Sequence, residues 1–375
     1  MKIFKGKAFF IKSFLLHIFL VAIIAFVSIN FWENSIYDTF IKKSSATTQG
    51  SDAISLVVID NNSLSTYRWP WARSLYGDMF QYFNKYTKAK VVVFDCILRS
   101  LDKNNPPTSD KYFFDTVKAS KNFIGAYMAT SAPYENQEIG NNYNEQFQKK
   151  FSINVTDKRK QNSQKYSQYN SMSVLPEPYF NALTNVGSTN LILDPIDGIL
   201  RASSDLISYN GQFFPSIALR TYLKANNTNQ ISLTDKYIIV NKTGLKIPVY
   251  QSYGNIKHTI KYYKLFNNSE YSHKKYSAVD IIKSYKLISE GKKPIINPEE
   301  FNNKIVIVGA NALSLQDAHD TPITSNHPGV DIQATILDNF LNSQFVNKIS
   351  SSVNIFIITI LSIVTFIIIR FLAFI

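Results

Sequence analysis

Cysteine is almost absent from this 375-residue chain, and long basic runs are absent as well. The single cysteine, Cys96, excludes a disulfide within one chain. It lies in the apolar run 91–98 with no basic neighbour to lower its thiol pKa, so we expect a buried, inert thiol. The net charge is +13, but the lysines are scattered among Asn, Tyr and Ser. We therefore do not expect nucleic acid as a partner.

The sequence also lacks the motifs of familiar enzymes: there is no Ser-His-Asp, Cys-His, zinc-finger or kinase signature. Residues 309–312 follow a strand, but they lack the further glycines of a dinucleotide fingerprint and the Gly-Lys-Ser/Thr of a P-loop. Asp317, His319, Asp320 and His327 have the chemistry of metal ligands, yet their spacing matches no established site. We expect no catalytic residue, no metal and no cofactor in this chain.

Two long apolar blocks stand out against this background. Residues 11–31 form a 21-residue stretch, about 31 Å long as a helix, which suffices to cross a bilayer core. A small-residue cleavage pattern does not follow it, so a retained anchor is favoured over a signal peptide. Residues 353–375 form the second block. Both are predicted to be transmembrane helices in contact with the lipid bilayer.

The lysines set the predicted orientation. Lys2, Lys5, Lys7 and Lys12 precede the first span or lie at its start, which favours a cytoplasmic N-terminus over residues 1–10. Arg370 near the end of the second span fits the same orientation. The chain then stops in apolar sequence, which suggests a truncated product.

The region between the two spans predicts an α/β fold. Its strand and helix signals alternate, which argues for a largely parallel sheet with flanking helices, bracketed by the N- and C-terminal transmembrane helices. Predicted strands are 54–60, 90–94, 123–128 and 304–309, and predicted helices are 73–86, 110–120, 177–183, 214–223, 278–288 and 330–340.

The middle of this region has a different pattern. Residues 131–172 are rich in Asn, Gln, Tyr, Lys and Ser, and are interpreted as a polar insertion or mobile loop. Residues 190–193 and 199–201 flank the turn formers of 194–198, which predicts a hairpin. Residues 236–266 are expected to form short strands of an antiparallel subregion.

Several polar and aromatic residues are candidates for a binding site. Asp60, Asp95 and Asp102 lie at or beyond the carboxyl ends of predicted parallel strands, where ligands bind in open α/β sheets. Arg73 is nearby, and Asp60, Asp95 and Arg73 lining one pocket is the sharper hypothesis. The alternative is that these aspartates cap helices or hold loops. Trp69 and Trp71 flank a proline just before a helix, as either a packed corner or a ligand platform.

The ordered set of these blocks resembles the type 2 CHASE domain, a cyclase- and histidine-kinase-associated sensory extracellular domain. The resemblance covers most of residues 50–342. It rests on a strand ending in Asp60, on Trp-Pro-Trp-Ala-Arg at 69–73 and on Val-Val-Phe-Asp at 92–95, and then on Asp102, Asn104, Asn105, Asp110, Asp194, Asp197, Gly198, Arg201, 304–309, Asp-Thr-Pro at 320–322 and Pro-Gly-Val at 328–330. It implies an extracytoplasmic sensor that precedes a cytoplasmic cyclase or kinase, and it adds Arg201 and Asp320 to the ligand-binding candidates.

The leading hypothesis is therefore a sensory domain in the bacterial inner membrane, with residues 50–342 in the periplasm and the output enzyme absent from this chain. A complete two-span protein acting as a partner subunit or ligand-binding protein is the alternative, and a metal-dependent hydrolase ranks below it. The expected partners are a small-molecule or envelope ligand and, as an open alternative, a second copy of the chain in a homodimer.

Overall fold

The computed structural model describes residues 14, 15, 17–19, 21–23, 33–130, 141–160, 167–252, 255–267, 269–311, 317–347 and 351–372. The chain divides into two compact units, which are described separately. Ser44–Val346 is the central unit. Met1–Lys43 together with Asn347–Ile375 is the terminal unit.

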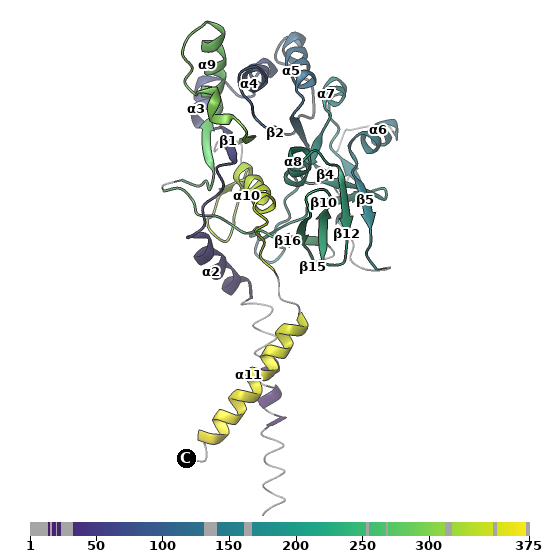
Figure 1. The fold of residues 1–375 in the computed structure, drawn as a ribbon, viewed down its shortest axis with the longest axis vertical. Coiled ribbons are helices and arrows are strands. Elements are labelled where there is room, and N and C mark those ends of the chain that lie inside the picture. The colour runs from purple at the N-terminus through teal and green to yellow at the C-terminus, as the bar shows by residue number, and fades with distance from the viewer. Residues whose placement is uncertain are drawn as a thin grey trace, which may run out of the picture. The chain divides into compact units, whose positions relative to one another are not determined.

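A six-stranded parallel sheet is the framework of the central unit (Figure 1). Its strands, in spatial order, are β17 (Lys274–Ser277), β1 (Ile54–Ile59), β18 (Ile305–Ala310), β2 (Val91–Asp95), β3 (Phe123–Tyr127) and β8 (Val186–Ser188). Every residue of β1 is buried, as expected for a parallel strand covered on both faces. The predicted parallel sheet is thus confirmed.

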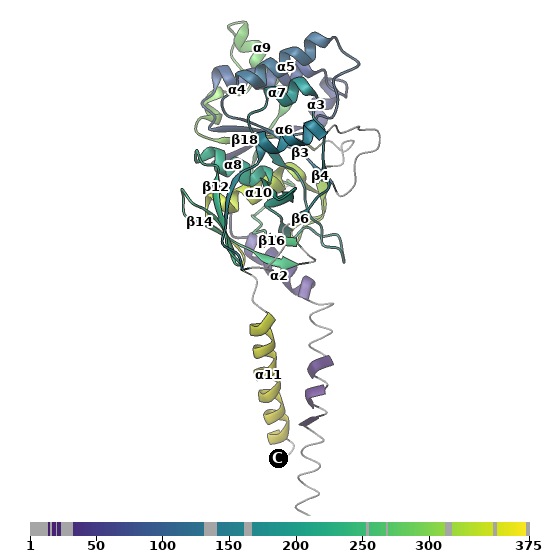
Figure 2. The same cartoon turned by 90° about the vertical axis from the view of Figure 1, so that its right-hand side faces the viewer.

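Helices cover both faces of this sheet (Figures 1 and 2). One face carries α3 (Asn61–Thr66), α4 (Arg73–Tyr86), α5 (Pro107–Ala119), α7 (Glu177–Ala182) and α9 (Ala278–Ser289). The other face carries α8 (Ile217–Ala225) and α10 (Gly329–Leu341). Aromatic rings fill the first interface: the Phe80 ring centroid lies 4.9 Å from that of Phe123 and 5.2 Å from that of Phe94. The predicted helix at 214–223 begins later, because residues up to Pro215 belong to a strand.

Short strands form the antiparallel subregion around α8 and α10. One sheet joins β14 (Leu245–Pro248), β13 (Tyr237–Val240), β12 (Gln230–Leu233) and β5 (Asn154–Asp157). Smaller sheets contain β11 (Gln212–Pro215), β10 (Leu206–Tyr209) and β6 (Ser167–Gln168), then β15 (Tyr250–Ser252), β16 (Asn255–Thr259) and β9 (Ala202–Ser203). The remaining elements are β4 (Ala129–Thr130), β7 (Ser171–Met172), β19 (Ala318–His319), β20 (His327–Pro328) and the short helix η2 (Pro298–Phe301). Antiparallel pairing within 236–259 agrees with the prediction for 236–266.

Two local expectations differ from the structure. Residues 190–193 and 199–201 are not strands; the turn forms, closed by the Asp194 amide donating to the Ile199 carbonyl at 3.1 Å, but no ladder continues from it. Within the expected polar insertion 131–172, helix α6 (Asn141–Phe151) buries Phe147 and Phe151, so this part is packed rather than a long loop. Residues 131–140 and 161–166 of that stretch lie outside the described residues.

The terminal unit contains α11 (Ser351–Leu372), most of α2 (Glu33–Ser45) and helical residues between 14 and 23. The His17 Nε2 atom lies 3.0 Å from the Ser362 carbonyl oxygen, and the rings of Phe14 and Phe366 meet edge to face at 5.2 Å. In the part of the chain that the structure describes, no helix combines the length and the apolarity that crossing a membrane requires. The spans at 11–31 and 353–375 therefore stay predictions.

Candidate functional site

Three aspartates lie at or beyond the ends of the parallel strands. Asp95 is the last residue of β2, and Asp60 directly follows β1. Asp317 follows β18 after residues 312–316, which lie outside the described residues. This carboxyl edge is where open parallel sheets bind ligands. The structure thus places Asp60 and Asp95 at the predicted strand ends, and Asp317 lies close enough to Asp95 to interact with it.

Asp95 and Asp317 influence one another and are called the carboxyl pair below. Burial raises the pKa of Asp95, and the nearby Asp317 charge raises it further. Burial likewise raises the pKa of Asp317, although His319, whose Nε2 lies 3.9 Å from Asp317 Oδ1, partly offsets this. Two carboxyls with raised pKa values at the mouth of a sheet favour sharing a proton or accepting a cationic group.

Gly329 makes room for the Asp317 side chain. A Cβ added at Gly329 would lie 2.5 Å from Asp317 Oδ1, so the Asp317 side chain would have to move to admit it. The Gly329 amide also donates to the Asp317 carbonyl at 2.9 Å. Gly329 is the first residue of α10, so the Asp317 carboxylate lies at the positive end of that helix dipole. Any shift of Asp317 would therefore bear directly on the start of α10.

Arg73 holds the loop that follows β2. Its Nη2 donates to the Ser100 carbonyl at 3.4 Å, and its Nε lies 3.8 Å from Asp110 Oδ1. The Asp110 Oδ2 accepts the Asp102 amide at 2.9 Å, which ties the loop to helix α5. Burial raises the pKa of Asp110. Arg73 is thus a loop anchor, and its charge also acts on Cys96 beside Asp95.

Asp102 organises the same loop. Its carboxylate accepts the Asn104 amide at 2.9 Å and the Asn105 side-chain amide at 2.8 Å. Burial alone would raise the pKa of Asp102, but these hydrogen bonds outweigh it and lower the pKa. Asp102 therefore stays ionised as the centre of a turn.

Hydrogen bonds within the fold occupy two of the other candidate residues, Trp71 and Asp60. Trp71 is buried, and its indole N–H donates to the Tyr67 carbonyl at 3.1 Å. Trp69 precedes a cis peptide bond to Pro70 and is 38 % exposed. Asp60 caps helix α3, accepting the Ser63 amide at 2.9 Å and the Ser277 hydroxyl at 2.8 Å. Of these three, only Trp69 offers a large free surface.

Arg201 and Asp320 belong to a different part of the central unit. Arg201 binds Asp197 through two parallel hydrogen bonds of 2.9 and 2.7 Å, and its Nη1 lies 3.5 Å from Asp194. This bidentate pair closes the turn at 194–198. The exposed Asp320 accepts the Asn326 amide at 3.1 Å. Among the described residues, no contact joins Arg201 or Asp320 to Asp95.

The residues considered as metal ligands do not converge. His327 is buried and bonded to Asp331, whereas His319 and Asp320 lie toward the surface. Within the described ranges, no three His, Cys, Asp or Glu side chains form a group that could hold a metal ion.

Burial raises the pKa of the Cys96 thiol well above its usual value, and the carboxyl pair adds to the effect. The thiol is therefore protonated and unreactive at neutral pH.

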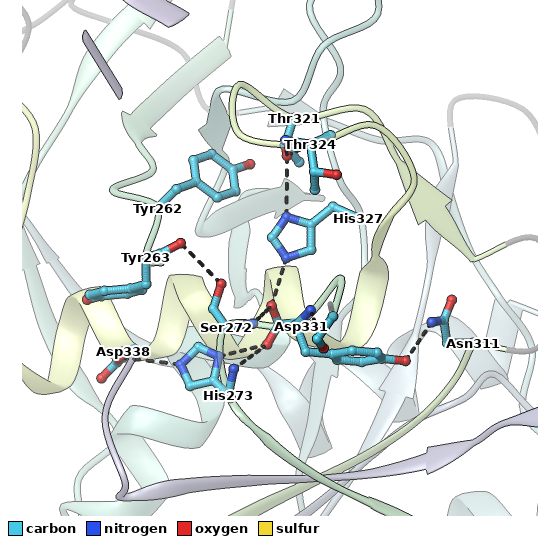
Figure 3. A network of polar contacts seen from close by, with 12 residues as sticks. Tyr262, Tyr263, Ser272, His273, Asn311, Thr321, Thr324, His327, Asp331 and Asp338 are labelled. Carbon is cyan, nitrogen blue, oxygen red and sulfur yellow. Dashed lines mark hydrogen bonds and ion pairs between the residues drawn. The ribbon is translucent and has the colours of Figure 1, made fainter. Parts of the chain in front are cut away.

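A buried network of His273, His327, Asp331 and Asp338 is built on helix α10 and is shown in Figure 3. His273 Nδ1 lies 2.8 Å from Asp331 Oδ1, and its Nε2 lies 3.3 Å from Asp338 Oδ2. His327 Nε2 lies 2.7 Å from Asp331 Oδ2. We call these four residues the buried histidine network. All four side chains have 0 % exposure, so the network fastens α10 to the loops that flank it.

The network holds a buried charge. Burial alone would lower the pKa of His273, but Asp331 and Asp338 outweigh it and raise the pKa to about 9. Burial would raise the pKa of Asp331, and the two histidines reverse this and hold it well below its usual value. Sequence reasoning missed the network. The available signal was the pair Asp331 and Asp338, which lie seven residues apart on one face of the predicted helix. Because α10 is buried almost throughout, these two carboxylates need buried polar partners.

A family model for the CHASE2 domain matches residues 16–369. The chain belongs to the CHASE2 domain family. No curated protein and no solved structure shows significant similarity to it. The resemblance seen in the sequence is thereby confirmed, and it extends beyond residues 50–342 in both directions.

The CHASE2 family is a sensory domain family of signalling receptors, and its domains are not catalytic. The carboxyl pair lies beside the Cys96 thiol, whose pKa it helps to raise. Its Asp317 side chain lies next to Gly329, the first residue of α10.

Proposed function

We propose that this chain is the membrane-anchored, extracytoplasmic sensory part of a bacterial signalling receptor, and that its ligand binds at the carboxyl pair. The observation that carries the binding site is the convergence of Asp95 and Asp317 at the carboxyl edge of the sheet, each with a raised pKa. Family membership supports the sensory role. Because two carboxyls meet there, the ligand is a small molecule or envelope component that presents an amino or other cationic group.

The path from ligand to signal runs through α10. A cationic group between Asp95 and Asp317 would draw the two carboxylates together. Asp317 packs on Gly329, the first residue of α10. The chain continues from the end of α10 at Leu341 to α11, which begins at Ser351. A ligand that prefers one position of α10 would shift the population of that position, and its differential affinity sets the size of the signal.

Anchoring is supported by the sequence of the two terminal blocks. Residues 11–31 and 353–375 are almost wholly apolar, and Lys2, Lys5 and Lys7 precede the first block. Large apolar side chains of α11 are exposed, among them Ile355, Phe356, Leu361 and Ile367 at 59–63 %. An exposed apolar surface of this kind calls for a lipid or protein cover. Alkaline carbonate extraction of native membranes tests the anchor, and release into the soluble fraction would contradict it.

A thermal-shift screen of the purified full chain in detergent tests the binding site. The probes are amino acids, polyamines and Ca²⁺. The wild-type chain should be stabilised by at least one of them, and Asp95→Asn should abolish that stabilisation while itself melting higher than wild type, because it removes the repulsion. The matched control is Asp115→Asn, at an exposed aspartate of α5. A stabilisation that survives in Asp95→Asn would exclude the carboxyl pair as the site.

A further inference from the structure

A polar cavity lies at the carboxyl end of helix α8, and its lining contains neither residue of the carboxyl pair. Its volume is about 360 Å³, within the range of sites for small organic ligands. Nine residues line it: Lys150, Ser152, Thr184, Asn185, Arg220, Lys224, Asn227, Thr228 and Asn229. Three are cations and six are neutral polar residues, and none is Asp, Glu or apolar. We call it the cationic pocket.

Arg220 is the buried cation of this pocket. The residue is only 5 % exposed, and its three hydrogen bonds go to neutral acceptors: the Val186 carbonyl at 3.1 Å, Asn229 Oδ1 at 2.8 Å and the Phe151 carbonyl at 2.6 Å. Burial lowers the pKa of Arg220 to about 10, so the group stays charged at neutral pH. A guanidinium has five N–H donors, so two have no partner among the described residues. A buried charge without a counter-charge is costly.

The two lysines add to this positive charge. Lys224 is one turn beyond Arg220 on α8, and no hydrogen bond or ion pair of its ammonium occurs in the described ranges. Lys150 Nζ donates to the Phe180 carbonyl at 2.7 Å and lies 4.7 Å from the Phe180 ring centre. Three cations that share a cavity without a carboxylate repel one another. A bound anion would remove that repulsion and supply the missing counter-charge.

The carboxyl end of a helix carries partial negative charge on its free carbonyl groups, which repels an anion. At the end of α8 this repulsion is reduced. The last carbonyls of α8 are already capped: the Asn226 amide is close to the carbonyls of Tyr222 and Leu223, and the Thr228 amide donates to Leu223 at 3.1 Å. Hydroxyl and amide side chains complete the rim and can donate to anionic oxygens or to the hydroxyls of a larger ligand.

We propose that the cationic pocket binds a small, multiply charged oxyanion, such as a phosphorylated metabolite. The two free N–H groups of Arg220 and the ammonium of Lys224 then donate to the charged oxygens of this ligand. Arg220 presents a fork that matches phosphate geometry, and the lysines act as point charges. The net charge of +13 favours capture of an anion. This site is independent of the carboxyl pair, whose ligand is cationic.

Isothermal titration of the full chain in detergent with inorganic phosphate tests the proposal. Chloride at matched ionic strength is the salt control. Saturable binding should weaken about tenfold in Lys224→Gln, which removes one charged contact. Lys246→Gln changes the same charge at an exposed position of β14 outside the pocket and should bind like wild type.

Sulfate and citrate are the comparison ligands. Competition by sulfate would support an oxyanion site, and tighter binding of citrate would support the same site with a carboxylate ligand. Absence of saturable binding for all three anions would overturn the proposal. Equal affinities in Lys224→Gln and Lys246→Gln would overturn it too, because the anion would then bind elsewhere. Circular dichroism of each variant checks that the fold is retained.

Discussion

Removal of the charge on His273 should make the stability of the chain less sensitive to mildly alkaline pH. The raised pKa of His273, from 6.5 to about 9, corresponds to roughly 3 kcal/mol in favour of the protonated form in the folded chain. A histidine with a raised folded pKa contributes its full stabilisation below the unfolded pKa and loses it as pH rises through the folded value. The free energy of unfolding should therefore fall between about pH 6.5 and 9.

At acid pH, the stability should change in the opposite direction because of Asp331. The pKa of Asp331 is lowered in the fold, so its contribution is present above the unfolded value of 3.8 and is lost as the pH falls through and below it. The combined stabilisation by His273 and Asp331 should thus be greatest between about pH 4 and 6.5. Tyr263 and His327 also pack around these groups, and His327 adds a hydrogen bond to Asp331.

Urea denaturation of the full chain in detergent, followed by tryptophan fluorescence from pH 6 to 9.5, measures this. In His273→Gln the part of the alkaline decline that His273 causes should disappear, so that the slope left below about pH 8 is that of Asp95, whose pKa is raised to about 8. The free energy of unfolding at pH 6.5 should fall by about 3 kcal/mol or more, because Asp331 and Asp338 lose a buried partner. The partly exposed His319→Gln is the matched control. An alkaline decline that persists unchanged in His273→Gln would refute the reasoning.

Three further changes probe the sheet edge. Arg73→Ala should destabilise the central unit by about 2 kcal/mol, because it leaves the buried Asp110 carboxylate without its cation. Lys111→Ala, at a side chain that is 74 % exposed, should change the melting temperature little. Equal effects in the two variants would count against Arg73 as the loop anchor. Gly329→Ala should cost about 1–3 kcal/mol through its clash with Asp317, and the added change Asp317→Ala should restore part of it, which a double-mutant cycle in thermal unfolding measures. Asp95→Asn should raise stability at pH 7 by about 1–3 kcal/mol, because a carboxyl with a raised folded pKa destabilises the fold above its unfolded pKa, and the gain should vanish in denaturation at pH 3.

Local patterns were enough to predict much of the sheet. The apolar run of β1 is short and is followed by a carboxylate, which is typical of a strand buried on both faces. The amphipathic spacing of α4 likewise fixed a helix with its apolar face inward. The expected carboxyl edge followed from these elements, because parallel strands end on one side. Asp95 was therefore placed correctly by sequence alone.

Spatial order and buried polar pairing could not be predicted in the same way. β18 lies between β1 and β2, although it follows them by more than 200 residues, and no local pattern encodes that neighbour. His273 pairs with Asp331 across 58 residues, so neither residue alone signals the network. The sequence suggested Asp317 only as a metal ligand. Its contact with Gly329 depends on how α10 packs, which no local pattern shows.

Topology labelling in spheroplasts tests the central claim, an anchored sensor on the extracytoplasmic side, most directly. Cysteine is introduced at Lys293, an exposed residue beyond α9, or at Lys5 near the N-terminus, each in a Cys96→Ala chain. The account predicts that a membrane-impermeant maleimide labels Lys293→Cys in intact spheroplasts and labels Lys5→Cys only after permeabilisation. Protection of Lys293→Cys in intact spheroplasts would contradict it, because the central unit would then lie in the cytoplasm.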